Sequence, residues 1–336
     1  MNNPQFHMPA EWESHSCTWM AWPSAPYTLG NQEQDRLAAY GAWSNVANAI
    51  VKFEPVKMLA RTEDLVIAKS FLDPNIELIA CKLNDGWMRD IGPTFVKSTE
   101  NKLVAVDWQF NGWGAQGNWA NWDFDDRVAS VVAKLENVPS TRSWLVNEGG
   151  GIHVNGAGKV LVTETVQLGK GRNPSATKVQ VEQELNQLLG TNEVIWFKRG
   201  LTRDYEDYGT QGHIDIVACF VNETTVLFHD QLDHGHPDFL VSAEVRQTIL
   251  DAGLTPLAMP APKILRDEVG WVDYSYVNHY LVNGGVILCA FDDENDEKAR
   301  AILQDCYPDR EIVLVDAREI FARGGGIHCI TQQQPI

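Results

Sequence analysis

The residues that could carry out chemistry lie in four short polar clusters. One of them, Gly326-Ile327-His328-Cys329, lies close to the C-terminus. A cysteine that follows glycines can be an accessible nucleophile when nearby positive charge or backbone dipoles stabilise its thiolate. A lone cysteine is more often a buried, inert thiol, but the glycine-rich setting of Cys329 favours the nucleophile.

A histidine and a carboxylate lie two positions apart in Gly212-His213-Ile214-Asp215. We expect a strand over Ile214–Val221, which would place both polar side chains on one face. An imidazole beside a carboxylate is an acid–base arrangement whose protonation can be tuned near neutral pH. A half-exposed polar strand face without chemistry would give the same pattern.

The other two clusters each contain a carboxylate close to glycines. Residues 84–93 bring Trp87, Arg89 and Asp90 into a turn-rich stretch, and Glu148 directly precedes a run of three glycines. Loops of this kind often carry binding and catalytic residues. An Arg–Asp ion pair that braces a turn would explain the first cluster equally well.

One five-residue string occurs twice. Gly149–His153 reads Gly-Gly-Gly-Ile-His, and Gly324–His328 repeats it 175 positions later. Consecutive glycines allow positive φ angles and close approach of the backbone. Two such elements predict pseudo-symmetric halves that face a shared centre, and two unrelated glycine-rich turns are the alternative.

The elements that must position these clusters are short β-rich runs that alternate with helical stretches. Asn173 followed by Pro174 is typical of a helix start. Strands separated by helices favour an α/β fold. The expected strands are Val56–Ala60, Leu103–Trp108, Val160–Thr163, Val194–Phe197, Ile214–Val221, Val286–Phe291 and Ile312–Val315, and the expected helices are Asp125–Leu135, Pro174–Leu189, Ala243–Ala252 and Glu294–Cys306.

Composition narrows the classes of protein and of partner. The 336 residues include 27 Lys and Arg against 45 Asp and Glu, a formal charge of −18. No basic stripe is visible, so we expect no nucleic-acid partner. The excess of acid could steer a cationic substrate or could serve solubility alone. The oligomeric state is left open, and a homo-oligomer is compatible with the sequence.

The N-terminus bears on the location of the protein, and the spacing of the cysteines bears on metal binding. We expect a cytoplasmic protein, because the N-terminus lacks the features of a secretory signal and no apolar stretch is long enough to span a membrane. The six cysteines form no CxxC pair, which argues against a structural zinc site.

A second candidate for chemistry is a metal site. Asp230, Asp233, His234 and His236 are close together in the sequence. The neighbouring glycine and proline indicate a surface turn, and no helical spacing places two imidazoles on one face. A metal-dependent amidohydrolase built on these residues remains an alternative hypothesis.

The motifs together resemble those of the agmatine deiminase family, which includes the Porphyromonas-type peptidylarginine deiminases. The similar segments are Met8–His15, Trp19–Pro23, Trp87–Pro93, Phe110–Gly114, Glu148–His153, Gly212–Asp215 and Gly326–Pro335. They occur in the family's order and cover essentially the whole chain. The resemblance implies a single catalytic domain over residues 1–336. Its α/β fold would be a five-bladed pseudo-symmetric propeller of ββαβ-like repeats around a central site.

The resemblance also implies a role for each matching residue. Cys329 would be the nucleophile that attacks a guanidinium carbon. Asp90 and Asp215 would hold the guanidinium nitrogens, since paired carboxylates suit a planar group with several donors. His213 would protonate the leaving ammonia and then activate water.

Three further residues complete the implied site. Glu148 would be the partner carboxylate of the catalytic histidine and would also bind substrate, while Trp87 and Gly326 would shape the pocket. The implied reaction converts agmatine to N-carbamoylputrescine and ammonia through a covalent thiouronium intermediate, a step of polyamine biosynthesis. It requires no metal and no organic cofactor.

One segment departs from the family's pattern. Agmatine deiminases carry an Asp-Glu-Thr-Asn-Gly-His run, whereas this chain has Asp207-Tyr-Gly-Thr-Gln-Gly-His213, with Gly209 at the position of the acidic residue. Asp204, Glu206 or Asp207 could substitute for it near the substrate tail. The alternatives are therefore a deiminase of arginine, of a peptidyl-arginine or of another alkylguanidine, and a non-catalytic guanidine-binding protein.

Overall fold

The strands form five separate sheets of three or four strands in the computed structural model, which describes residues 5–116 and 119–336. Each sheet contains an antiparallel pair followed by a parallel pair. Because parallel neighbours need a crossover connection, a helix lies between the two parallel strands each time. The expected α/β class is confirmed. Over the described residues a ββαβ unit occurs in four sheets, and in the first sheet β17, from the other end of the chain, takes the place of the first strand of the unit.

The sheets have the following strand orders. The first is β17 (Thr331–Pro335), β2 (His15–Ala21), β3 (Val56–Ala60) and β4 (Glu77–Ala80); the second is β1 (Phe6–His7), β5 (Thr94–Ser98), β6 (Leu103–Gln109) and β7 (Ser140–Val146). The third is β10 (Glu193–Phe197), β9 (Lys159–Thr163) and β8 (His153–Val154). The fourth is β11 (Ala218–Phe220), β12 (Thr225–Asp230) and β13 (Thr255–Pro260), and the fifth is β14 (Tyr280–Val282), β15 (Gly285–Ala290) and β16 (Glu311–Asp316).

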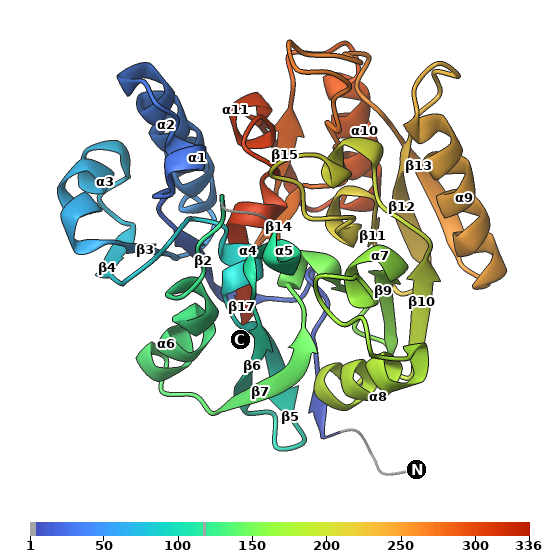
Figure 1. Cartoon of the computed structure of the whole chain (residues 1–336), viewed down its shortest axis with the longest axis horizontal. Helices are drawn as coiled ribbons and strands as arrows, with labels where there is room; N and C mark the ends of the chain where they lie inside the picture. Colours follow the sequence, from blue (N-terminus) through green and yellow to red (C-terminus); the bar gives the residue numbers. More distant parts are fainter. Residues whose placement is uncertain (1–4, 117–118) are drawn as a thin grey trace.

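The crossover helices lie towards the periphery of the view in Figure 1, outside the strands that they connect. They are α2 (Glu33–Ile50), α6 (Val128–Leu135), α8 (Lys178–Leu189), α9 (Asp238–Asp251) and α10 (Asp296–Cys306). In α6, Val128 and Val132 are buried together, as expected for positions one turn apart on an inward-facing stripe. None of the helices in the described part of the chain has the length and apolar character needed to cross a membrane.

The shorter helical segments occupy the connections. They are α1 (Pro26–Leu29), α3 (Leu65–Phe71), α4 (Met88–Ile91), α5 (Gly112–Ala115), α7 (Glu164–Gln167) and α11 (Arg318–Phe321). The single 3-10 turns are η1 (Thr62–Asp64), η2 (Asp125–Arg127), η3 (Gly149–Gly151), η4 (Thr202–Tyr205), η5 (Ile214–Ile216) and η6 (His328–Ile330). Four of them, α4, η3, η5 and η6, carry the motif residues, and α4 contacts both η3 and η6.

The two ends of the chain meet in the first sheet. β17 pairs antiparallel with β2, with Gln332 opposite Trp19. The indole of Trp19 donates to Gln334 at 2.7 Å. This closure holds the segment that follows Cys329 against a core in which Trp19, Trp22 and Trp43 are fully buried. Three of the 12 tryptophans therefore serve packing.

Three local predictions were wrong. The helix expected to begin at Ala243 is α9, which begins five residues earlier, at Asp238. The strand expected over Ile214–Val221 is a 3-10 turn followed by the short β11, so His213 and Asp215 are not neighbours on a strand face. The helix expected to begin after Asn173 begins at Lys178. Its cap is Thr177, which forms a capping box with Gln180 and satisfies the first free N–H groups. The side chain of Asn173 instead bonds the backbone of Val146.

Candidate active site

Cys329 lies in η6, directly after the second glycine run, and is buried. Its Sγ is 3.4 Å from Asn278 Nδ2 and 3.5 Å from Asp215 Oδ2. The sulfur borders a small cavity of about 10 Å³. The other lining residues are Tyr27, Trp87, Asp90, Trp113, Tyr208, Thr210, Arg323 and Gly324.

The surroundings of the thiol are anionic. Burial raises the pKa of Cys329 well above its usual value, and the nearby carboxylates of Asp215 and Asp90 raise it further. The Asn278 amide acts in the opposite direction but is outweighed. A cationic group held by the two carboxylates would lower this pKa, because opposite charge favours the ionised form.

The imidazole of His213 faces two carboxylates. Its Nε2 is 3.2 Å from Glu148 Oε2, and its Nδ1 is 3.8 Å from Asp90 Oδ1. Burial alone would lower the pKa of His213, but Asp90 and Glu148 reverse this effect and raise the pKa to about 9. The histidine is therefore an imidazolium at neutral pH, with a proton available to an acceptor in the cavity.

Glu148 is held by a residue that the sequence did not indicate. Arg172 Nε donates to both carboxylate oxygens, at 2.9 and 3.0 Å, and Arg172 Nη2 donates to the Thr210 carbonyl at 2.7 Å. Burial raises the pKa of Glu148, but Arg172 and His213 more than offset this and the net pKa is lowered. Glu148 thus stays ionised and fixes the orientation of the His213 ring.

Asp90 is held in α4 by two donors. Trp113 Nε1 donates to its Oδ2 at 2.8 Å, and the Gly150 N–H donates to its Oδ1 at 3.1 Å. Burial raises the pKa of Asp90 to about 6, with His213 lowering it and the other two carboxylates raising it.

Asp215 offers one free oxygen. His328 Nδ1 bonds its Oδ2 at 2.8 Å, whereas its Oδ1 is buried and has no hydrogen-bond partner. His213 Nδ1 is likewise buried and unpartnered. Buried polar atoms are nearly always paired. Two unpartnered atoms on neighbouring catalytic candidates therefore mark where a polar ligand would bind.

The first glycine run lies inside this cluster. A Cβ on Gly150 would lie 2.5 Å from His213 Nδ1 and 3.0 Å from Asp90 Oδ1. The glycine therefore allows the imidazole and the carboxylate to meet over the backbone. Both copies of the repeat reach the same centre, since the rings of His153 and His328 are 6.3 Å apart.

Gly326 acts differently from Gly324 in the second run. Gly324 borders the cavity, whereas a Cβ on Gly326 would lie 2.4 Å from Asn278 Oδ1. Gly326 therefore makes room for the amide that reaches Cys329 and the His328 N–H. The sequence did not single out Asn278, which lies in the loop between β13 and β14, outside every recognised motif.

The segment around Gly209 explains the missing acidic residue. A Cβ on Gly209 would lie 2.1 Å from the Asp204 carbonyl oxygen, so no side chain fits there. The buried Asp204 carboxylate is occupied by the backbone N–H groups of Thr210, Gly212 and His213. It braces the loop rather than facing the cavity.

Aromatic rings cover the cavity in place of that carboxylate. Tyr208 stacks on Tyr27, with ring centroids 5.4 Å apart, and Trp119 packs edge-on against both rings. Trp113 in turn stacks on Trp119 at 5.5 Å. Trp113 belongs to the Phe110–Gly114 motif, which was the one signal in the sequence for these aromatic rings.

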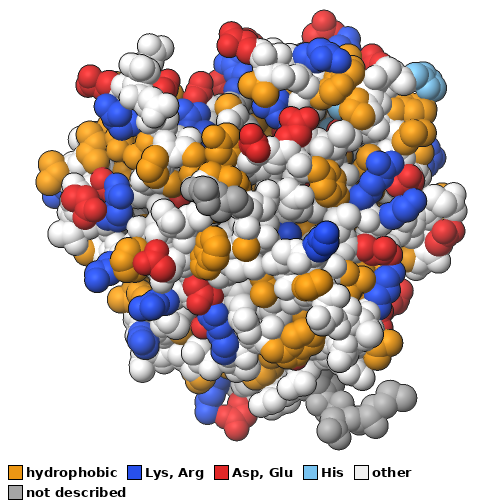
Figure 2. Space-filling view, in the orientation of Figure 1, with side chains coloured by type: hydrophobic (Ala, Val, Ile, Leu, Met, Phe, Trp, Pro, Cys, Tyr) orange, Lys and Arg blue, Asp and Glu red, His pale blue; other side chains and the backbone are white. Residues whose placement is uncertain are grey.

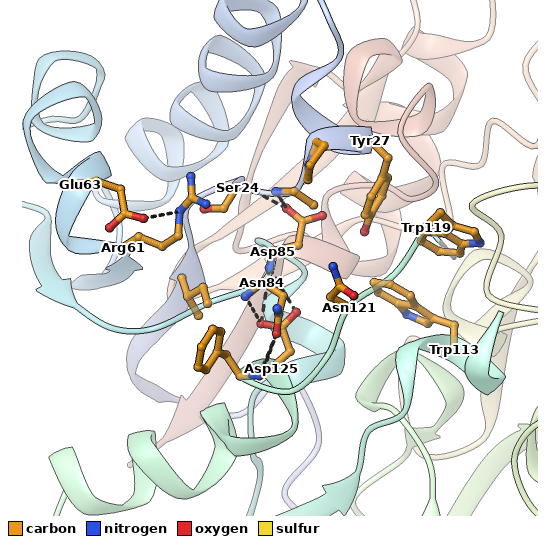
Figure 3. Close-up of a pocket in the computed structure, with 14 residues that line it drawn as sticks. Ser24, Tyr27, Arg61, Glu63, Asn84, Asp85, Trp113, Trp119, Asn121 and Asp125 are labelled. Atoms are coloured by element: carbon orange, nitrogen blue, oxygen red, sulfur yellow. Dashed lines mark hydrogen bonds and ion pairs between the residues drawn. The ribbon is translucent and has the colours of Figure 1, made fainter. Parts of the chain in front are cut away.

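A larger cavity of about 280 Å³ shares Tyr27 and Trp113 with the Cys329 cavity. Figure 3 shows Tyr27, Trp113 and Trp119 along one side of it and Arg61 and Glu63 opposite. Asp85 and Asp125 also line it, but both carboxylates accept hydrogen bonds from the surrounding loops. On the face in Figure 2, acidic and basic side chains are interspersed, with no large patch of one sign.

The metal hypothesis gains no support from geometry. Among residues 5–116 and 119–336, no group of three or more His, Cys, Asp or Glu side chains is arranged to hold a metal ion. His236 is buried and its Nδ1 accepts from the Asp238 N–H, while Asp233 caps its own turn through the Gly235 N–H.

The comparisons with known proteins fit the site just described. The sequence profile of the family described as Porphyromonas-type peptidyl-arginine deiminase matches residues 7–335. The chain belongs to this family. Its match to the Porphyromonas-type profile includes every motif residue around the cavity.

Individual relatives are similar over nearly their full length. A Streptomyces coelicolor protein named "Putative agmatine deiminase" is 51% identical, covering 98% of this chain and 99% of that protein. The agmatine deiminase of Ectopseudomonas mendocina is 38% identical, covering 98% and 95%. The solved structure of the agmatine deiminase of Enterococcus faecalis has a TM-score of 0.91 at 33% identity, covering 98% of this chain and 96% of that one.

Proposed function

We propose that this chain is an agmatine deiminase that hydrolyses agmatine to N-carbamoylputrescine and ammonia. The observation that carries the proposal is the arrangement around the Cys329 cavity. Cys329 and Asp90 line this cavity, Asp215 Oδ2 is 3.5 Å from the sulfur, and the His213 imidazolium is 3.8 Å from Asp90. The free atoms Asp215 Oδ1 and His213 Nδ1 are buried. A planar guanidinium can donate to carboxylates on two sides while its carbon faces the sulfur.

The first half-reaction begins when the cation binds between Asp90 and Asp215. Its charge lowers the pKa of the Cys329 thiol, which loses its proton to solvent. The thiolate attacks the guanidinium carbon and forms a neutral tetrahedral adduct. His213 then transfers its proton to one amino nitrogen, the C–N bond breaks, and ammonia leaves a cationic thiouronium on the sulfur.

The second half-reaction uses the same imidazole as a base. Neutral His213 removes a proton from water, and the hydroxide adds to the thiouronium carbon. The adduct collapses and the C–S bond breaks. The hydroxyl proton passes to the departing Cys329 thiolate, which restores the thiol, and the ureido product leaves. The Glu148–Arg172 pair supports both steps, because it keeps the ring oriented while its charge changes. No metal and no organic cofactor enters the scheme.

The remaining site residues determine the shape of the Cys329 cavity. Trp87 borders the cavity and its indole N–H donates to Asp85 at 2.9 Å, which fixes the ring beside the sulfur. Gly326 leaves room for Asn278. The aromatic cover of Tyr27 and Tyr208 favours the aminobutyl tail of agmatine, because ammonium groups are attracted to aromatic faces.

The larger architecture belongs to the same proposal. We infer that the five sheets form the blades of one propeller with the site at its centre, and that residues 1–336 are one catalytic domain. The enzyme would act on a small cationic substrate in the cytoplasm, as a homo-oligomer or a monomer, without nucleic-acid or membrane partners.

The test is ammonia release by the purified chain from agmatine, arginine and a blocked arginyl peptide, with and without a chelator. Selective, chelator-insensitive turnover of agmatine supports the proposal. Turnover of only another guanidine would change the substrate, and loss of activity with chelator would favour metal chemistry. No turnover of any of the three would reject the proposal.

Variants of Cys329 and His213 test the roles proposed for the nucleophile and for the acid–base residue. Cys329→Ser should abolish ammonia release while the protein stays folded. Cys81→Ser is the matched control, because Cys81 is half-buried after β4 and does not border the cavity. His213→Ala should still bind agmatine but lose rate. Substantial turnover by folded Cys329→Ser would exclude that residue as the nucleophile.

A further inference from the structure

A buried histidine next to the nucleophile takes no part in the mechanism above. His328 precedes Cys329, and only a few per cent of its surface is exposed. Its Nδ1 is 2.8 Å from Asp215 Oδ2, and its Nε2 is 2.9 Å from Glu11 Oε2. Glu11 belongs to the segment between β1 and β2, more than three hundred positions away along the chain.

This geometry defines the protonation of the ring. An ionised carboxylate only accepts hydrogen bonds, so each of the two ring nitrogens must carry a proton to satisfy its neighbour. Burial and Arg89 lower the pKa of His328, but the two carboxylates outweigh them and the pKa is raised. His328 is thus an imidazolium between two buried anions.

The other groups around the ring do not supply a competing acceptor. Arg89 Nε donates to the His328 carbonyl at 3.2 Å. The rings of His153 and Tyr280 are 6.3 and 6.5 Å from the His328 ring. Burial lowers the pKa of His153 to about 3 and raises that of Tyr280, so both stay neutral near pH 7.

The far carboxylate is itself held rigidly. Glu11 Oε1 accepts from the Leu281 N–H at 2.9 Å, while its other oxygen faces His328. Burial raises the pKa of Glu11, but His328 and Arg89 more than compensate and the pKa is lowered. Glu11 therefore has a fixed position and a permanent charge, which is what holding an imidazolium requires.

We propose that Glu11 and His328 are positioning residues for Asp215, and this inference rests on the proposed deiminase function. The imidazolium binds Oδ2, which fixes the carboxylate beside the sulfur and leaves the buried, unpartnered Oδ1 free for a guanidinium N–H. It also keeps Asp215 ionised although that carboxylate is buried. The N-terminal segment thereby contributes to substrate binding without touching the substrate.

A purely structural ion network would give the same contacts, so the test must report on Asp215. Burial raises the pKa of Asp215, but His328, His213 and Arg89 offset this and the net pKa is lowered. Glu11→Gln preserves the shape, since its amide can donate to a neutral Nε2 and accept from Leu281. Glutamine does not carry the negative charge that stabilises protonated His328. The ring therefore becomes neutral, and the positive charge beside Asp215 is lost.

The experiment measures kcat/KM for agmatine against pH in the parent and in Glu11→Gln. Because a neighbouring opposite charge lowers a carboxyl pKa by about one unit or more, loss of that charge should raise the pKa of Asp215 by about that amount. The acidic limb, which Asp90 sets near pH 6 in the parent, should then become steeper and move to higher pH as Asp215 titrates close to it. At neutral pH, KM should rise more than kcat falls. Glu11→Asp, which keeps the charge, should return the limb towards its original position.

The matched control is Glu54→Gln. Glu54 is also buried and also bonds a histidine, His15 at 3.2 Å, but it does not contact Asp215 or the cavity. Glu54→Gln should lower thermal stability and leave the pH profile unchanged. A Glu11→Gln profile that superimposes on the parent profile would overturn the inference, as would an equal shift in Glu54→Gln.

A second measurement is independent of turnover. In the ¹⁵N spectrum of histidine-labelled parent protein, the His328 signals should be those of a doubly protonated ring at neutral pH. They are assigned by their loss in His328→Gln, or by their shift in Glu11→Gln if the first variant does not fold. A neutral His328 ring would overturn the inference. If the parent released no ammonia, the proposed function would fail while this spectrum still decided the state of His328.

Discussion

Adding one methyl group at Gly150 should disable the site without unfolding the protein. The Cβ would lie 2.5 Å from His213 Nδ1, where ordinary contact begins at 3.4 Å, so the imidazole must move by about 0.9 Å. The ring cannot rotate away freely, because Glu148 bonds its Nε2 and Asp90 faces its Nδ1.

The size of the effect follows from that displacement. A misplacement of about 1 Å can cost about 100-fold in rate, which corresponds to about 2.7 kcal/mol in the activation free energy. Gly150→Ala should therefore lower kcat for agmatine by about two orders of magnitude. KM should change less, because Asp215 Oδ1 remains free to bind the guanidinium.

The assay is steady-state ammonia release at matched protein concentration, with thermal unfolding to confirm that the variant is folded. Gly41→Ala is the control, because a Cβ at this position in α2 meets no atom within 4 Å. It should leave kcat unchanged and stabilise the helix by roughly 0.5–1 kcal/mol. A folded Gly150→Ala enzyme with kcat within a few-fold of the parent would refute the argument.

Three further changes have defined outcomes. The pH profile of kcat/KM should be bell-shaped, rising as Asp90 ionises near pH 6 and falling as His213 loses its proton near pH 9, since the guanidinium itself stays charged throughout. Arg172→Gln should destabilise the protein by about 3–5 kcal/mol in urea denaturation, because it leaves the Glu148 carboxylate buried without its cation. Thr177→Ala should cost about 1 kcal/mol of stability through loss of the helix cap, with activity unchanged.

Each of these outcomes can be contradicted. A profile that stays flat between about pH 5 and about pH 8 would exclude Asp90, whose pKa is about 6, as the carboxylate that must ionise. An Arg172→Gln protein as stable as the parent would show that Glu148 finds another partner. A Thr177→Ala change that alters kcat would mean that α8 is coupled to the site.

The helices and strands show where sequence patterns succeed. Val56–Ala60 was predicted to the residue, because a short apolar run, interrupted only by Lys57, is typical of a buried strand. The helix α2 was not predicted, although it is 18 residues long. Its buried positions mix small residues (Ala39, Ala42 and Ser44) with large aromatic ones (Tyr40 and Trp43), and this mixture does not form a clear apolar stripe in the sequence.

The active site shows both what such patterns identify and what they miss. Five residues were selected by type and motif, and the fold brings them together: Cys329, His213, Asp215, Glu148 and Asp90. Cys329 and Asp90 line one cavity, and the other three each lie within 3.8 Å of one of the five. The expectation that His213 and Asp215 share a strand face was wrong, because a 3-10 turn separates them.

The sequence by itself determined the residue types at the site, the two glycine runs and the membership in a family, because these features are local and survive as motifs. Only the tertiary structure decided which charges meet. Arg172 on Glu148, Asn278 on Cys329 and Glu11 on His328 join segments between 24 and 317 positions apart. Such contacts set the protonation of the site through distance and burial, and neither quantity is written in the order of the residues.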